Sequence, residues 1–442
     1  MELTLRTTRD LSPAQKTCIP FAPDPGVENQ VVNLYPEVTF ETLEGFGGAI
    51  TDSAAYVYSL MNEAQKQELL ETYFSPARMN YGLVRIHMDS CDFSLGLYEA
   101  DSDPEDRNLE KFSMERTEKY ILPMLSDAQR AAGRPLELML SPWSPPAFMK
   151  TNGRRVGGGQ LKPEYRAAWA DYLCRYIREF RDRGYKVRRI SLQNEPKAVQ
   201  TWDSCIFTAG EQKEFLRDFM APAMRRHGLE DVEVFIWDHN KERVYEWLRD
   251  IIDRDTDPLV AGAAFHWYSG DHFEALDLAR RRFPDKKLII SESCIEFSKF
   301  GGEDAARSAL RLSHEIMGDL NHGMTAFYDW NLLLDETGGP NHVGNLCLAP
   351  FLFDTGEKQL RPQLIARHFE HFSHYLLPAS VRIGHSRYTD ELDVTAWRRP
   401  DGALAVVLLN RSEEGLPICL RLNGEAASLE LPAEAIATGL IR

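Results

Sequence analysis

Short apolar runs alternate with longer segments of helical periodicity along most of this chain. Each run ends in a cluster of polar or aromatic residues. The runs begin at Glu44, Gly82, Leu136, Arg188, Val232, Val260, Lys287 and Met324. Strands that alternate with helices form parallel βαβ units, and eight such units predict a (β/α)8 TIM barrel.

The segment between the third and fourth runs shows the helical pattern most clearly. Its apolar residues recur at steps of three and four before a closing Gly184, and they are Trp169, Leu173, Tyr176, Ile177 and Phe180. The alternative fold is an open, doubly wound sheet, which more often carries a glycine-rich phosphate turn after its first strand. The first run, EGFGGAI, does not spell GxGxxG, so we favour the barrel.

The pattern changes after about Asp354. The segments ELDVTAWRRPDGALAVVLLNRS and PICLRLNGEAASLEL alternate apolar and polar residues around a Pro-Asp-Gly hairpin turn. The residues before Glu44, with three prolines in CIPFAPDPG, also indicate strands and turns. We therefore expect both ends to join in a small β-sandwich on the side of the barrel. Residues 1–43 would supply its N-terminal strands, residues 44–354 the barrel, and residues 355–442 the C-terminal β-sandwich domain.

Composition narrows the class of partner. The chain has 442 residues, 43% of them hydrophobic, and a formal net charge of −16. This acidic balance argues against nucleic acid and anionic membrane surfaces as partners, because both call for basic patches. No run approaches the ~18 apolar residues of a membrane span, so we expect no stable membrane insertion.

The seven cysteines are scattered and form no CxxC pair, so they signal neither a zinc site nor a disulfide framework. Such cysteine usage suits a reducing compartment. The first residues, MELTLRTTRDLSPAQK, lack the apolar core of a secretory signal. We expect a cytoplasmic protein that uses no metal or other cofactor, and the sequence leaves its oligomeric state open.

The ends of the predicted strands collect carboxylates, amides and indoles, with almost no lysine. In a barrel these ends meet at one face, where catalytic side chains gather. Indole faces stack on the apolar faces of sugar rings, and carboxylates and amides bind pairs of hydroxyls. The sequence therefore predicts a sugar site.

Glu195 closes the fourth predicted strand and Glu292 closes the seventh. These strands lie across the barrel mouth from one another, so the two carboxyls can face one glycosidic bond. Carboxyls ~5–5.5 Å apart give retention of configuration, and carboxyls ~6.5–9.5 Å apart give inversion. Taken singly, Glu195 would fit a solvated turn and Glu292 a rim ion pair; together they favour catalysis.

The neighbours of the two glutamates suggest different protonation states. Pro196 is expected to hold Glu195 in extended geometry, and desolvation there would raise its pKa and keep it protonated as an acid. A hydroxyl donor near Glu292 would keep that carboxylate ionised and nucleophilic.

Seven motifs together resemble glycoside hydrolase family 30, especially its glucosylceramidase-like branch. They cover nearly the whole chain and are EGFGGAITDSAA, RIHMDSCDFS, SPWSPPAFMKTNG, LQNEPKA, AFHWY, SESC and YDWNLLLDETGGPNHVGN. The resemblance implies a retaining enzyme with a (β/α)8 barrel and a side β-domain. It also implies that Glu195 is the acid/base, that Glu292 is the nucleophile and that Asn194 contacts the 2-hydroxyl of the sugar.

The same resemblance implies the remaining binding residues. They are Asp92, Trp143, Trp330, Asn345, His266 and Tyr268. The first two match positions that hold the outer hydroxyls of the sugar, and the next two match further sugar contacts. The last two match groups around the nucleophile.

We predict a retaining, exo-acting β-glycosidase that hydrolyses a β-glucoside or a related small β-linked saccharide. Two departures from the lipid-cleaving relatives, the short segment QTWDSCIF and His342 in place of an aromatic, fall on the aglycone side and put a ceramide leaving group in question. A β-1,6-glucanase or a β-xylosidase of the same family stays an alternative. So does a non-catalytic carbohydrate-binding barrel.

Overall fold

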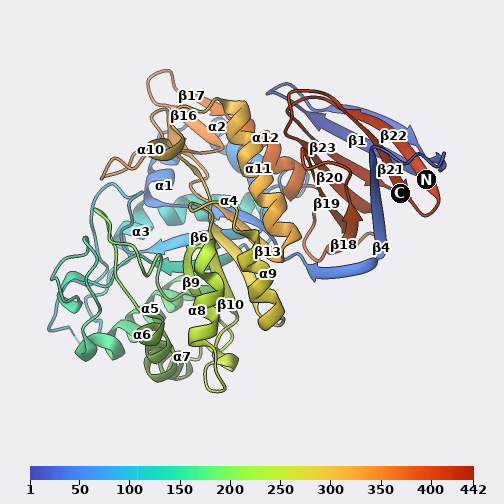
Figure 1. Cartoon of the computed structure of the whole chain (residues 1–442). Helices are drawn as coiled ribbons and strands as arrows, with labels where there is room; N and C mark the ends of the chain where they lie inside the picture. The colour runs from blue at the N-terminus through green and yellow to red at the C-terminus, as the bar shows by residue number, and fades with distance from the viewer. Residues whose placement is uncertain (107) are drawn as a thin grey trace.

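The computed structural model describes residues 1–106 and 108–442. Eight parallel strands close into a barrel in the order β10-β11-β13-β5-β6-β7-β8-β9, which confirms the predicted fold (Figure 1). The strands are β5 (Gly45–Ala49), β6 (Leu83–Met88), β7 (Glu137–Pro142), β8 (Lys186–Ser191), β9 (Glu233–Asn240), β10 (Gly262–His266), β11 (Lys287–Glu292) and β13 (Met324–Asp329). All eight predicted runs correspond to these strands.

The barrel strands are buried on both faces, and this burial explains why they read as continuous apolar runs. Inside the barrel one apolar layer is formed by Leu83, Met139, Phe235, Ala264, Ile289, Ala326 and Tyr328. Two fully buried arginines lie inside the barrel, one toward each end of it. Arg189 donates to Glu44 at 2.7 Å, at the N-terminal end of the strands, whereas Arg85 reaches Glu292 at the C-terminal end.

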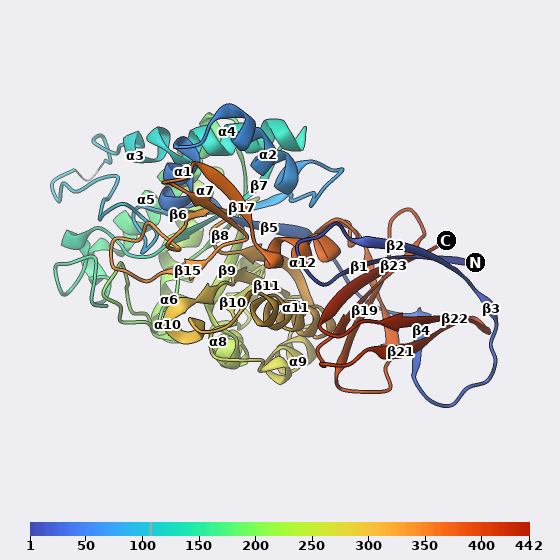
Figure 2. The ribbon, with the colours of Figure 1, turned by 90° about the horizontal axis from the view of Figure 1, so that it is seen from above.

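Helices surround the barrel in both views (Figures 1 and 2). They are α1 (Asp52–Ser59), α2 (Glu63–Phe74), α3 (Glu115–Lys119), α4 (Ile121–Ala132), α5 (Arg166–Asp182), α6 (Ala209–Glu214), α7 (Ala221–Arg226), α8 (Val244–Ile251), α9 (Phe273–Arg282), α10 (Phe297–Phe300), α11 (Ala305–Asn321) and α12 (Leu364–Ser373). Helix α5 buries the five apolar residues of its predicted stripe, and Gly184 follows it with a φ of 84°. A π-helical segment, Phe215–Met220, joins α6 to α7.

The two ends of the chain form one β-domain beside the barrel, as predicted, and both termini lie in it (Figure 1). Its ten strands follow the order β2-β1-β23-β20-β19-β18-β4-β21-β22-β3. They are β1 (Glu2–Thr8), β2 (Gln15–Pro20), β3 (Ala22–Pro23), β4 (Val31–Thr42), β18 (Val381–Ser386), β19 (Leu392–Arg398), β20 (Leu404–Asn410), β21 (Leu416–Leu422), β22 (Glu425–Leu431) and β23 (Ala435–Ile441). Strand β1 pairs antiparallel with β23, so the first and last strands of the chain are neighbours.

Helices α11 and α12 connect the barrel to the β-domain, and Figure 2 shows them beside its strands. His371 of α12 bonds through its two ring nitrogens to Thr438 and Thr8, each at 2.9 Å. His314 of α11 bonds to Asp393 of β19 at 2.7 Å. These contacts fix the position of the β-domain on the side of the barrel.

Short strands complete the loops that follow β11 and β13. They are β12 (Ile295–Glu296), β14 (Leu334–Asp335), β15 (Cys347–Leu348), β16 (Phe351–Asp354) and β17 (Gln359–Pro362). Strand β12 pairs with β15, and Glu296 and Cys347 of this pair line the cavity at the barrel mouth. The pairing thereby fixes the chain that follows Glu292.

Candidate active site

A cavity of about 180 Å³ lies at the C-terminal end of the barrel strands. Eight of the nine predicted site residues line it. They are Asp92, Trp143, Asn194, Glu195, Tyr268, Glu292, Trp330 and Asn345. The ninth, His266, is fully buried at the end of β10, where it contacts Glu195.

Glu292 is the last residue of β11, and two donors fix its carboxylate. Arg85 Nη1 donates to Oε2 at 2.7 Å, and the Tyr268 hydroxyl donates to Oε1 at 3.0 Å. Hydrogen bonds to an ionised group are among the stronger ones in proteins, and two of them define the orientation of the carboxylate. The hydroxyl donor that the sequence analysis expected near Glu292 is therefore Tyr268.

Arg85 joins groups from several barrel strands. Besides Glu292, it donates to Asn194 Oδ1 at 2.8 Å, to Asp238 Oδ2 at 3.0 Å and to Ser141 Oγ at 3.1 Å. Arg85 is not among the site residues predicted from the sequence. The signal was present, because an arginine inside the apolar run LVRIHM is buried by its strand and a buried guanidinium requires acceptors.

Glu195 lies in the loop that follows β8. Its φ is 46°, in the left-handed region, so the extended geometry expected from Pro196 is wrong. The tertiary structure overrides that local preference, because the backbone N–H of Glu195 donates to the Asp238 carbonyl at 2.8 Å. The preceding N–H, of Asn194, donates to the Pro142 carbonyl at 2.8 Å. Strained residues persist where the surrounding bonds fix them in this way, and they cluster at active sites.

Two histidines face the Glu195 carboxylate. His266 Nδ1 lies 3.2 Å from Oε1, and His239 Nδ1 lies 3.6 Å from the same oxygen. The other ring nitrogen of His266, Nε2, bonds to Asp238 Oδ1 at 3.2 Å. His266 thus links Glu195 to Asp238, and it is also the strand partner of Glu292 in the pairing of β10 with β11.

The surrounding charges shift the pKa values of the two glutamates opposite to our expectation. Burial raises the pKa of Glu195, but the charges of His239 and His266 and the hydrogen bond from His266 outweigh it, and the pKa lies below its usual value. Burial raises the pKa of Glu292 and outweighs the opposing charges of His266 and Arg85. Apolar neighbours were visible in the sequence, whereas the imidazoles that face Glu195 come from other strands.

His266 carries the proton nearest to Glu195. Burial lowers the pKa of this imidazole, but the charge of Glu292 and the hydrogen bonds to Asp238 and Glu195 outweigh burial and raise the pKa to about 9. At neutral pH the ring is therefore charged and donates to both carboxylates. The proton that we expected on Glu195 is therefore on His266, its hydrogen-bond partner.

An aromatic wall and a carboxyl–amide pair complete the cavity. The rings of Trp143 and Trp330 stack with centroids 5.4 Å apart, and the Arg85 guanidinium lies over both. Asn345 Nδ2 donates to Asp92 Oδ2 at 3.1 Å, and burial together with the charge of Glu292 raises the pKa of Asp92 well above its usual range. A sugar has apolar ring faces and hydroxyl groups. The indole rings match the former, and the carboxyl–amide pair matches the latter.

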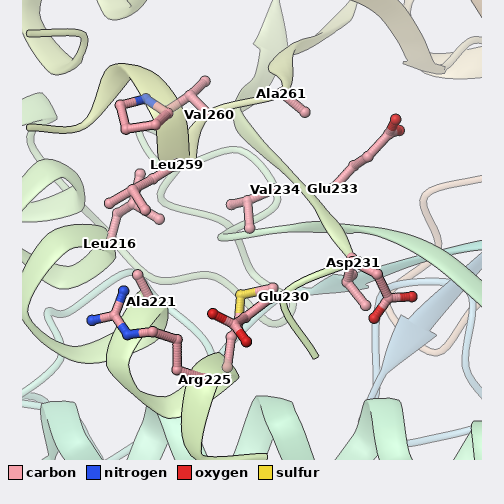
Figure 3. A pocket seen from close by; sticks show the side chains of 13 residues that line it. Leu216, Ala221, Arg225, Glu230, Asp231, Glu233, Val234, Leu259, Val260 and Ala261 are labelled. Carbon is pink, nitrogen blue, oxygen red and sulfur yellow. The ribbon is translucent and has the colours of Figure 1, made fainter. Parts of the chain in front are cut away.

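A second cavity, of about 360 Å³, lies at the opposite end of the barrel strands. Figure 3 shows the apolar side chains of Leu216, Val234 and Leu259 around it, with Arg225 and Glu230 nearby. It adjoins the start of β9 and the segment before β10. None of the predicted site residues lines this cavity, so the predicted sugar chemistry belongs to the smaller one.

Comparisons with known proteins agree with this geometry. The Glycosyl hydrolase family 30 TIM-barrel domain matches residues 43–376, and the family's beta sandwich domain matches residues 380–439. The chain belongs to glycosyl hydrolase family 30. Membership confirms the resemblance drawn from the motifs, and it supports glycosidase activity on a saccharide substrate.

Individual relatives of this family 30 chain have more than one specificity. The lysosomal acid glucosylceramidase of Mus musculus is 32% identical over 409 residues, which cover 88% of this chain and 79% of that protein. The crystal structure of SrfJ from Salmonella typhimurium matches with a TM-score of 0.96 and 34% identity over 100% of both chains. The endo-beta1,6-glucanase BT3312 matches with a TM-score of 0.88 and 25% identity over 100% of this chain and 99% of that one.

In the part of the chain that the structure describes, no helix is both long enough and apolar enough to cross a bilayer.

We predict that His266 titrates near pH 9 in the folded protein, above the ~6.5 of an unfolded histidine. Because the folded pKa is the higher one, the stabilisation from its two carboxylate contacts is complete below pH ~6.5 and is lost as the pH rises through about 9. The free energy of unfolding of the wild type, relative to His266→Gln, should fall across that window. NMR of the imidazole nitrogens measures the pKa directly, and a His266 signal that titrates at or below ~6.5 would contradict this prediction.

Proposed function

We propose that this protein is a retaining, exo-acting β-glycosidase that hydrolyses short β-glucosides, with Glu292 as the nucleophile and Glu195 as the acid/base. One observation carries the proposal: the two carboxyls face one small cavity and have different partners. Glu292 is held by Arg85 and Tyr268, which orient a carboxylate. Glu195 is bonded to His266, which holds a proton.

In the first step Glu292 attacks the anomeric carbon while Glu195 protonates the departing oxygen. The proton reaches Glu195 from Nδ1 of His266 along their 3.2 Å hydrogen bond. A sugar in the cavity displaces water, and desolvation favours the neutral pair of acid and imidazole over the ion pair. Substrate binding thus converts a low-pKa carboxylate into the acid that the step requires.

In the second step the ester between the sugar and Glu292 is hydrolysed. Glu195, now ionised, takes a proton from the attacking water, and the sugar leaves with its configuration retained. The freed carboxylate of Glu292 returns to the hydrogen bonds from Arg85 and Tyr268.

The remaining predicted residues bind the sugar in this proposal. Asn194 accepts from Arg85 through Oδ1, which leaves its amide nitrogen for the 2-hydroxyl. Asp92 and Asn345, already bonded to each other, form a pair suited to neighbouring outer hydroxyls. Trp143 and Trp330 supply the apolar wall.

The size of the cavity favours exo action. Sites for small molecules commonly enclose ~300–1,000 Å³, and this cavity encloses about 180 Å³. A space of this size suits one terminal sugar residue. A groove for several residues of a polysaccharide would be longer and more open.

A β-1,6-glucanase is the second candidate. The likeness to the endo-beta1,6-glucanase BT3312, which extends over the whole chain, favours it. The same cavity walls would surround the glucose whose bond is cleaved in either case. The two candidate functions differ in the leaving group, which is the rest of a β-1,6-glucan chain in one and a short aglycone in the other.

We also propose a cytoplasmic location. All seven cysteines are free thiols in the structure, and six of them are buried. Unpaired cysteines in these numbers are typical of a reducing compartment.

Replacing Glu292 with glutamine removes the nucleophile, so we predict that turnover falls below about 1% of the parent's, a loss of more than ~2.7 kcal/mol in transition-state stabilisation. Turnover is measured on a panel of aryl β-glucosides, aryl β-xylosides, β-1,6-glucan oligomers and glucosylceramide. Glu315→Gln is the matched control, because Glu315 is also a buried glutamate and lies outside the cavity. Turnover of Glu292→Gln above about 1% of the parent's, in preparations free of contaminating glycosidase, would refute the assignment. Intact sugar binding without cleavage of any panel member by the parent would favour a non-catalytic barrel.

The role of Glu195 predicts a dependence on the leaving group. Glu195→Gln should lose ~10²–10⁴-fold in the rate of glycosyl transfer to the enzyme for an alkyl β-glucoside. The loss should be much smaller for 2,4-dinitrophenyl β-glucoside, whose leaving group needs no proton. Pre-steady-state release of the aglycone measures this rate for both substrates. An equal loss for both would show that Glu195 does not act as the acid.

A further inference from the structure

Glu195, His239 and His266 place three metal-binding atoms around one point at the edge of the cavity. One carboxylate oxygen and two imidazole nitrogens lie within 4.8 Å of one another. We propose that these residues form a binding site for a divalent transition-metal ion of the zinc class. We further propose that an ion bound there inhibits the enzyme.

The distances fit tetrahedral coordination. Zinc binds imidazole nitrogen and carboxylate oxygen at ~2.0–2.2 Å, and the corner-to-corner distance of such a tetrahedron is about 3.4 Å. Glu195 Oε1 lies 3.2 Å from His266 Nδ1 and 3.6 Å from His239 Nδ1. Small side-chain adjustments therefore bring all three atoms to bonding distance of one ion.

The two imidazoles are already oriented for this task. Nδ1 of His239 is buried and makes no hydrogen bond to any residue that the structure describes. A buried polar atom without a partner requires an explanation, and a metal ion supplies one. The His239 ring rests on Trp237, with centroids 5.1 Å apart, and the Trp237 indole donates to the Asn240 carbonyl at 2.9 Å. This packing fixes the direction of the free nitrogen.

The His266 ring has the support that metal-binding histidines usually have. Its second nitrogen, Nε2, bonds to Asp238 Oδ1, and Asp238 is held in turn by Arg85 and Ser291. A carboxylate behind a histidine fixes the ring and directs its other nitrogen to the metal. An ion bound to Nδ1 displaces one proton from that atom to the solvent.

The site leaves one coordination position for solvent. Both Glu195 and His239 line the cavity, so a water molecule completes a tetrahedron on that side. Two imidazoles with one carboxylate suit zinc, copper and nickel better than magnesium or calcium, which prefer oxygen ligands. A bound ion coordinates the Glu195 carboxylate, which then cannot donate or accept a proton. The proposed inhibition therefore rests on the proposed role of Glu195 as acid/base.

Isothermal titration calorimetry of the chelator-treated full chain with zinc chloride tests the site without any substrate. The expected result is one ion per chain for the wild type and binding weaker by at least ~100-fold for His239→Gln, which removes one ligand. His322→Gln, at a half-exposed histidine that bonds to Asp277, is the matched control and should bind as the wild type does. Cys18→Ser removes the exposed thiol and should also leave binding unchanged.

Absence of binding to the wild type, equal binding by His239→Gln, or loss of binding in Cys18→Ser would overturn the site. Cobalt(II) added to the wild type gives a second readout that needs no variant, because a tetrahedral ion absorbs strongly in the visible and an octahedral one weakly. Weak absorption would likewise overturn it.

Zinc should also slow hydrolysis of an aryl β-glucoside, and a chelator should restore the rate. Binding at this site with unchanged turnover would overturn the inhibitory role alone. If the protein cleaves no glycoside, the proposed function fails, and calorimetry and the cobalt spectrum still decide the metal site.

Discussion

A guanidinium ion enclosed in the barrel determines the arrangement of the catalytic end. Arg85 is fully buried, and it is bonded to the carboxylates of Glu292 and Asp238 and to the amide of Asn194. Removing one partner from a buried ion pair leaves the other charge without compensation, at a cost of ~3–5 kcal/mol. Arg85 therefore holds the groups of β8, β9 and β11 in one arrangement that tolerates little displacement.

The second charged group, His266, makes the two glutamates unequal. Its contacts with Glu195 and Asp238 place a proton beside Glu195. Glu292 instead accepts hydrogen bonds from Arg85 and Tyr268. Glycoside hydrolysis with retention requires such a difference, since one carboxyl must attack and the other must donate. The strained backbone contributes, because Glu195 and Asp238 both have positive φ values, 46° and 59°, at the tips of neighbouring strands.

The fold could be predicted almost completely, because burial on both faces leaves a continuous apolar run for each barrel strand and alternation in the β-domain leaves a different pattern. The gathering of Glu195 and Glu292 followed from the barrel as well, since parallel strands end at one face. The left-handed backbone conformation of Glu195 could not be predicted from the sequence. Its conformation depends on a hydrogen bond to the next strand, which overrides the local effect of Pro196. The partner of His266 depends on register shifts of β10 against β9 and β11, which no local pattern encodes.

In the proposed mechanism Glu292 forms the covalent bond to the sugar, and Glu195 acts as the acid/base from the other side of the cavity. Incubation with a 2-deoxy-2-fluoro-β-glucosyl fluoride slows the second step and traps that bond. Mass spectrometry of the digested protein should then locate one fluoroglucosyl group on Glu292. A label on Glu195 or any other residue, or rapid turnover to the α-anomer without a trapped species, would contradict the account.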